Sequence, residues 1–200
     1  MKEFNIRPIG IVKNEVDIEI LRYANKDIEL DHKRIKSTGH EFNTSEIVIY
    51  DEYLECLDGI EDFSHLMIIY WTHKTPDHSR NIKKVHPAGL KSMPIKGIFA
   101  TRSPVRPNPI ALSSARLLER KDNTIIVEGL DAINESPVID IKPHLPSYDS
   151  PLNVKIADWM YAIAEQFKEL HENGKDNKES SESPQFDMRS HPCICDDQKL

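Results

Sequence analysis

The segment from Arg102 to Pro109 is the part of the chain whose residue types point most directly to chemistry. Three prolines within six residues exclude a helix and a strand ladder there, because proline fixes φ and lacks an amide proton. Arg102, Arg106 and Asn108 are thereby presented on a rigid turn, and guanidinium and amide donors bind carboxylates and other anions. The alternative is a stiff surface turn whose arginines pair with acidic neighbours.

This turn lies inside a basic island, the stretch from His78 to Leu118, which contains no Asp or Glu. The whole chain carries a net charge of -7, so it is not a generic nucleic-acid clamp. The island either contacts phosphates or is a solvated loop whose counter-charges come from elsewhere in the fold. Its cations are Arg80, Lys83, Lys84, Lys91, Lys96, Arg102, Arg106 and Arg116.

Other common chemistries lack their motifs, since no dinucleotide-binding glycine motif, Walker loop or nucleophile elbow is present. Three cysteines do not make a secreted disulfide framework, and no stretch approaches the roughly 18 apolar residues of a membrane span. We therefore expect a cytoplasmic protein. His191, Cys193 and Cys195 are ligand types, but the Cys-x-Cys spacing is tighter than that of zinc fingers, and no metal site is predicted.

The elements that must position the turn are predicted to be short strands. Apolar alternation or short apolar runs indicate strands at 4–12, 46–50, 64–73, 97–101, 110–118, 124–128 and 137–143. Residues 17–46 have no clear period and are predicted as a loop with at most a short helix. Residues 76–94 are predicted as a long loop. Because βαβ spacing is missing, we predict a mainly β fold, a small antiparallel β-barrel.

The C-terminal part is predicted as one amphipathic helix followed by a flexible tail. Ser150 and Pro151 are a typical helix start, and Gly174 a typical stop. The predicted organisation is a barrel domain at 1–149, a helix at 150–174 and a disordered tail at 175–200. One stripe of the helix is expected to pack on the barrel or on a partner subunit, and it consists of Ile156, Met160, Ile163, Phe167 and Leu170.

Four sequence blocks resemble the signature of the TrmO (YaeB-like) family: Asp62–Leu66, Gly97–Pro104, Arg106–Ile110 and Pro137–Pro143. Their order and spacing agree with the family, and the similarity covers roughly residues 4–149. The resemblance implies a β-barrel enzyme that acts as a homodimer. It also implies S-adenosyl-L-methionine (SAM) as cofactor, tRNA as partner and methylation of the N6 nitrogen of threonylcarbamoyladenosine beside the anticodon.

The resemblance also implies site residues. Its SAM contacts fall on His73, Arg102, Leu112, Val138, Ile139, Asp140 and Ile141. Methyl transfer depends mostly on positioning, but the ureido-like target nitrogen benefits from a proton acceptor. We expect Asp140 in that role, with Lys142 holding a phosphate or the threonyl carboxylate; a salt-bridged strand residue is the alternative for Asp140. Substrate contacts are expected from Lys96, Arg106, Asn108 and Tyr148.

The chain departs from the family pattern at several positions. No Pro-Arg-Gln type segment is found between Val16 and Asp31, Ala111 stands where glycine is usual, and His144 stands where tyrosine is usual. Two further functions therefore stay open: a methyltransferase of the same fold with a different small-molecule or RNA substrate, and a non-enzymatic RNA- or nucleotide-binding module.

Overall fold

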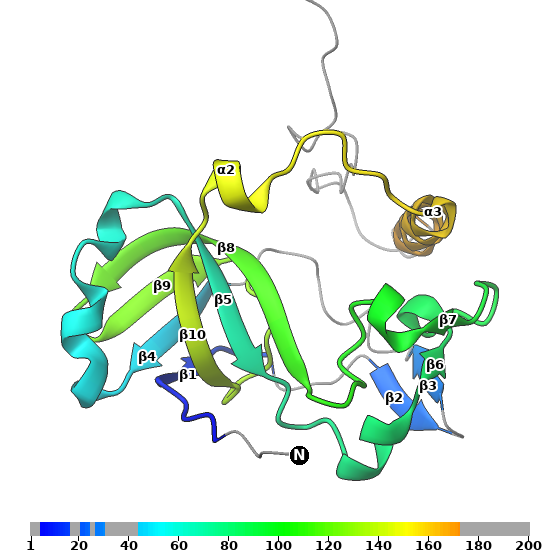
Figure 1. Ribbon diagram of the computed structural model, residues 1–200, viewed down its shortest axis with the longest axis horizontal. Coiled ribbons are helices and arrows are strands. Elements are labelled where there is room, and N and C mark those ends of the chain that lie inside the picture. Colours follow the sequence, from blue (N-terminus) through cyan, green and yellow to red (C-terminus); the bar gives the residue numbers. More distant parts are fainter. Residues whose placement is uncertain (1–4, 17–20, 25–26, 31–43, 173–200) are drawn as a thin grey trace, which may run out of the picture.

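The computed structural model describes residues 5–16, 21–24, 27–30 and 44–172, and most of its strands form one closed barrel (Figure 1). Every neighbouring pair in the barrel is antiparallel, which confirms the predicted mainly β architecture. In spatial order the strands are β1 (Gly10–Lys13), β10 (Pro137–Pro143), β5 (His65–Trp71), β8 (Ile110–Lys121), β9 (Thr124–Glu128) and β4 (Thr44–Ile49).

The first strand closes the barrel by pairing on both of its sides. Gly10 lies opposite Val138 of β10 and opposite Ile49 of β4. The strand begins at Gly10 rather than at residue 4, because Pro8 has no amide proton to give to a ladder. Ile9 still extends the pairing, since its amide donates to the Val138 carbonyl at 2.8 Å.

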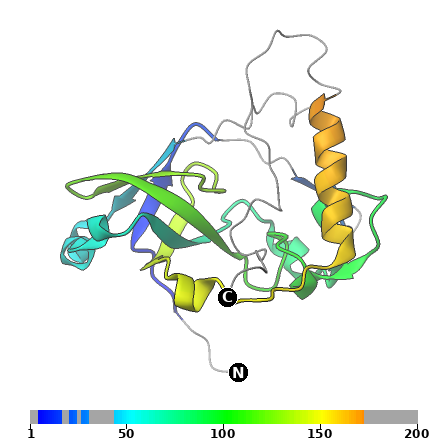
Figure 2. The same cartoon turned by 90° about the horizontal axis from the view of Figure 1, so that it is seen from above.

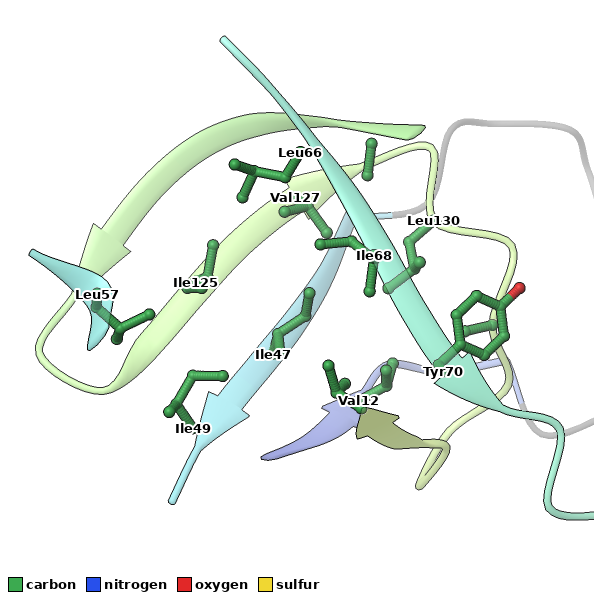
Figure 3. Packing of buried hydrophobic residues seen from close by; sticks show 13 residues of the cluster. Val12, Ile47, Ile49, Leu57, Leu66, Ile68, Tyr70, Ile125, Val127 and Leu130 are labelled. Atoms are coloured by element: carbon green, nitrogen blue, oxygen red, sulfur yellow. The ribbon is translucent and has the colours of Figure 1, made fainter. Parts of the chain in front are cut away.

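The barrel interior is filled by the inward-facing side chains of these strands (Figure 3). Along β5 the buried positions alternate with partly exposed ones, so the predicted central strand is half-buried rather than covered on both faces. Each fully buried aliphatic side chain contributes about 1.5–3 kcal/mol. The core includes Val12, Ile47, Ile49, Leu66, Ile68, Tyr70, Ala115, Ile125, Val127 and Val138.

The connection between β5 and β8 forms a second body beside the barrel, which we call the basic lobe (residues 76–109). It contains the two-stranded sheet of β6 (Lys84–Val85) and β7 (Lys96–Gly97) and three 3-10 helices, η3 (Asp77–Asn81), η4 (Pro87–Gly89) and η5 (Ile98–Ala100). Val85, Ile98 and Val105 form its small core. The predicted long loop is thus a packed unit.

Two predictions for this region were wrong. Residues 98–101 are a 3-10 turn rather than a strand, because both the amide and the hydroxyl of Thr101 donate to the Ile98 carbonyl, at 3.1 and 2.9 Å. The segment 17–46, predicted as a loop with at most a short helix, contains a hairpin of β2 (Leu21–Ala24) and β3 (Asp27–Leu30). Two four-residue strands are too short for a period to be recognised.

The hairpin is joined to the basic lobe through Asp27. Its Oδ2 lies 2.5 Å from His86 Nδ1 and 2.6 Å from Lys91 Nζ, and its Oδ1 accepts the His86 amide at 3.1 Å. The Asp27 side chain is only 16% exposed, so water screens these contacts weakly.

The C-terminal helix α3 (Asp158–Glu172) begins later than the predicted Ser150. Ser150 instead follows the short helix α2 (Pro146–Asp149), and Asn153 has a φ of 57°, which no α-helix accommodates. The predicted stripe residues Ile156, Met160, Ile163 and Phe167 are half-buried. The side-chain Nε2 of Gln166 donates to the Ser92 hydroxyl at 2.9 Å, which places α3 beside the basic lobe (Figure 2). The side chain of Leu170 and the tail at 175–200 lie outside the described residues.

Candidate functional site

The proline turn lies against the end of the central strand β5. We call this end of the barrel the His73 end. Thr72 donates through its amide and its hydroxyl to the Pro109 carbonyl, at 2.8 and 3.0 Å. His73 follows, half-buried, with its Nδ1 3.4 Å from the Ser136 hydroxyl. Burial and the nearby charge of Lys74 lower the pKa of His73, so its imidazole is neutral at neutral pH.

Arg102 and Leu112, which the resemblance pairs in cofactor binding, are in direct contact. Arg102 is exposed, and its Nη2 donates to the Leu112 carbonyl oxygen on β8. The guanidinium makes no other hydrogen bond or ion pair with the described residues, so its remaining donors are available to an anionic ligand. Leu112 adds an apolar side chain that is 38% exposed.

A buried polar group lies directly behind this pair. The hydroxyl of Tyr70 donates to the Asp131 carbonyl oxygen and lies 3.3 Å from the Ser113 hydroxyl. Four polar residues of this end were not predicted from the sequence as site residues: Tyr70, Ser113, Asp131 and Ser136. A signal for Tyr70 was present, because a tyrosine in a predicted buried strand needs a polar partner for its hydroxyl.

Asp140 lies in one row with Leu112 on the outer face of the barrel, because Ile69 of β5 pairs with both residues. Two strand spacings separate their backbones, which is about 10 Å. The Asp140 carboxylate accepts the Ile141 amide at 2.9 Å and lies 2.5 Å from Lys142 Nζ. The ion pair considered as the alternative for Asp140 is therefore present. Because the side chains of Asp140 and Lys142 are 43% and 63% exposed, water screens the ion pair and a ligand can compete for Lys142.

The other predicted residues of β10 face different ways. Val138 is fully buried and Ile141 packs against the core, so their side chains do not reach the outer face. The pairing of β10 with β5 is irregular between Val138 and Asp140, which places Ile139 at a bulge. Bulges often re-aim side chains beside binding sites.

The four predicted substrate residues are not brought together. Arg106 is used within the turn, where it donates to the carbonyls of Ser103 at 3.1 Å and Thr101 at 2.9 Å. Asn108 is exposed on the same turn, and Lys96 lies on β7. Tyr148 is 83% exposed on α2, at the opposite end of the barrel from His73.

His144, one of the departures from the family pattern, also lies at that opposite end. Its amide donates to the His65 carbonyl at 2.9 Å, where β5 begins. His144 is therefore not a neighbour of His73.

The cations of the basic lobe differ in what they contact. Arg80 pairs with Asp77 at 2.8 Å and lies over the Trp71 ring, and Lys91 pairs with Asp27. By contrast, Lys83, Lys84 and Lys96 form no ion pair among the described residues. Lys83 and Lys84 are exposed and Lys96 is half-exposed, so these lysines are available to phosphate groups.

The end of the molecule opposite the basic lobe carries exposed acidic side chains. The 3-10 helices η1 (Asp51–Leu57) and η2 (Ile60–Asp62) lie on the far side of the barrel from the basic lobe (Figures 1 and 2). Their exposed acidic residues are Asp51, Glu52, Glu55, Glu61 and Asp62.

Within the described ranges, no helix is long and apolar enough to cross a membrane. In the same ranges, no cluster of three or more His, Cys, Asp and Glu side chains is placed to hold a metal ion. The predicted ligand types His191, Cys193 and Cys195 lie outside the described residues.

The fold defines a small antiparallel β-barrel domain with a basic lobe at one end. The chain belongs to the family described as the tRNA-methyltransferase O N-terminal domain, whose model matches residues 33–150. This confirms the resemblance that the four sequence blocks indicated.

Individual relatives agree with that assignment. A Methanothermobacter thermautotrophicus protein named a probable S-adenosyl-L-methionine-binding protein is 38% identical over 148 residues, which are 74% of this chain and 95% of that protein. The Homo sapiens tRNA (adenine(37)-N6)-methyltransferase is 42% identical over 106 residues, 53% of this chain but only 24% of that enzyme.

A crystal structure of TrmO from Pseudomonas aeruginosa superposes with a TM-score of 0.54 at 23% identity, covering 77% of this chain and 61% of that one. At this identity the likeness shows the shared fold.

Proposed function

We propose that this protein binds SAM at the His73 end and transfers its methyl group to the N6 nitrogen of threonylcarbamoyladenosine beside a tRNA anticodon. The contact between Arg102 and Leu112 is the observation that carries the proposal, because it fixes a guanidinium beside an exposed apolar side chain. The name of the human relative supports the choice of reaction.

The residues of this end fit the chemical groups of SAM. The unengaged donors of Arg102 suit the carboxylate of the methionyl part, and the exposed Asp131 suits its ammonium. Leu112 offers an apolar surface to the adenine. The lowered pKa of His73 matters because a neutral imidazole does not repel a sulfonium cation.

Bound SAM supplies an electrophilic methyl group, and the chain itself has to orient the target nitrogen and receive its proton. Asp140 is placed for the second task, on the outer face in the row of Leu112 and Ile69. In the free protein, Lys142 Nζ lies 2.5 Å from the Asp140 carboxylate. An anionic group of the substrate can compete for Lys142, which leaves the carboxylate free to accept the proton of the target nitrogen.

The basic lobe supplies the tRNA contact in this proposal. Lys83, Lys84 and Lys96 carry positive charge that the described residues do not neutralise, and phosphate contacts of this kind give salt-dependent affinity without sequence choice. The acidic η1 and η2 repel the RNA backbone from the far end, so the two charged ends orient the RNA.

The test of the proposal combines binding and transfer. Isothermal titration with SAM is followed by an assay with radiolabelled SAM on tRNA that carries or lacks the threonylcarbamoyl group. Binding with label entering only the modified tRNA supports the proposal. Binding without transfer points to another substrate, and a wild-type protein that does not bind SAM contradicts it.

Pairs of matched charge-neutralising variants sharpen the test. Arg102→Gln should weaken SAM binding at least tenfold. Arg116→Gln should leave it within twofold, because Arg116 is exposed and pairs with His65 at the start of β5, away from the His73 end. Asp140→Asn should reduce transfer while SAM still binds, and Asp122→Asn on an exposed turn is its control. Full turnover of Asp140→Asn would rule out the proton-acceptor role.

The homodimer implied by the family resemblance is part of this proposal. Several apolar side chains at the start of the C-terminal segment are exposed in the single chain, among them Tyr148 at 83% and Leu152 at 87%. Light scattering on the purified protein should give the mass of two chains, and the mass of one chain would contradict the proposed dimer.

A further inference from the structure

Tyr70 is the polar member of the inward-facing row of β5, which also contains Leu66 and Ile68. It is 3% exposed, and its neighbours across the two ladders are Ala111 and Val138. Figure 3 shows its ring at the edge of the packed core, with the hydroxyl oxygen pointing away from the other labelled side chains. Because burying an unpaired hydroxyl is costly, the partners of this oxygen show what the residue does.

The hydroxyl joins two separate segments of the chain. It donates its single proton to the Asp131 carbonyl oxygen, so the Ser113 hydroxyl, 3.3 Å away, has to be the donor in the second bond. The direction of donation therefore runs from Ser113 on β8 through Tyr70 to the loop that follows β9. Ser113 is 9% exposed, so water is a poor substitute for this link.

This link reaches the candidate cofactor residues at both of its ends. On the β8 side, Ser113 directly follows Leu112, whose carbonyl receives Arg102. Burial raises the pKa of Tyr70, the Asp131 charge raises it further and Arg102 lowers it, so both charged groups act on the phenol. Asp131 and Arg102 are thus arranged around one buried hydroxyl.

We propose that Tyr70 is a positioning residue that fixes the separation between the Asp131 loop and Arg102, and so selects a ligand end bearing both an ammonium and a carboxylate. The proposal rests on the proposed function, since SAM is the ligand with that zwitterionic end. Tyr70 itself does not touch the ligand in this arrangement.

The experiment compares two ligands on Tyr70→Phe, which removes the hydroxyl and keeps the ring. SAM carries the amino-acid end, whereas 5′-methylthioadenosine has the adenosine and the sulfur without it. Tyr70→Phe should raise the dissociation constant of SAM at least tenfold and leave that of methylthioadenosine within twofold. Tyr161→Phe, a half-exposed tyrosine on α3, is the control and should change neither.

A merely structural role for Tyr70 predicts a different result, because a loosened barrel weakens both ligands together. Equal weakening of the two ligands, or no weakening of either, would overturn the proposal. If the wild-type protein binds neither ligand, the proposed function itself is contradicted, and this outcome is read before any variant is made. Ser113→Ala keeps Tyr70 in place, should show the same selective loss, and carries the test if Tyr70→Phe does not fold.

Discussion

Replacing Gly10 by alanine tests how tightly β1 is held in the barrel. A Cβ atom at this position would lie 2.5 Å from the Val48 carbonyl oxygen, 3.0 Å from Cδ1 of Ile49 and 3.1 Å from its Cα. The Cδ1 atom ends a flexible side chain and can move aside, whereas the Val48 carbonyl oxygen belongs to the β4 backbone and cannot. The new methyl group therefore has to push β1 away from β4.

The expected loss of stability comes from overpacking and from stretching the backbone hydrogen bonds of β1. Overpacking of this kind costs about 1–3 kcal/mol, and each backbone hydrogen bond that is stretched adds about 0.5–1.5 kcal/mol. We expect Gly10→Ala to lower the free energy of unfolding by about 2–4 kcal/mol. For a chain of this size, that lowers the melting temperature by about 10 °C.

Two other glycines provide matched controls, measured by calorimetry under the same conditions. Gly97 has a φ of -60° and nothing within 4 Å of its added Cβ, so Gly97→Ala should be neutral or slightly stabilising. Gly59 also has free space but a φ of 78°, so Gly59→Ala should cost about 1 kcal/mol in backbone strain. Equal melting temperatures for the Gly10 and Gly97 variants would refute the reasoning.

Three further predictions concern charge. Because the pKa of His73 is lowered from 6.5, the unfolded chain takes up this proton before the folded chain does as the pH falls, so the stability from this group is present above pH 6.5 and lost below it. His73→Asn should therefore flatten this part of the plot of unfolding free energy against pH, and an unchanged plot would contradict the prediction. The double variant Lys83→Ala, Lys84→Ala should reduce the slope of log affinity for tRNA against log salt by about 1.5, and an unchanged slope would exclude these lysines from the contact. Asp27→Asn should lower stability by about 2 kcal/mol and speed proteolysis of the hairpin, whereas Asp77→Asn, 88% exposed, should do neither; similar effects of both would show that burial of Asp27 is irrelevant.

The barrel was predictable because its strands carry local signals. Residues 64–73 and 124–128 contain apolar runs, and the turn at Lys121–Asn123 is marked by polar residues, with Asp122 at a φ of 51°. The β2–β3 hairpin was not predictable, since its attachment through Asp27 and His86 depends on residues far apart in the chain. Likewise, the start of α3 depends on the conformation of Asn153, which the favourable pair Ser150–Pro151 does not reveal.

The candidate site was predictable only where a residue of a linear motif is exposed on the surface of the folded protein. The proline turn indicated Arg102 correctly as an exposed donor, but the same turn consumes Arg106 in its own carbonyl contacts. Whether an arginine serves a ligand or the backbone is decided by which carbonyls lie within its reach, and no spacing rule contains that information. The Tyr70 link was missed for the same reason, because its partners lie on two other segments.

The placement of β10 between β1 and β5 has a consequence for synthesis of the chain on the ribosome. Until Pro137–Pro143 has left the exit tunnel, one edge of β1 and one edge of β5 have no partner, and exposed edges pair readily with other chains. A nascent chain that stalls after β9 has emerged but before β10 has emerged therefore exposes two unpaired strand edges. Once residue 143 has emerged, the ring of strands is complete and both edges are protected.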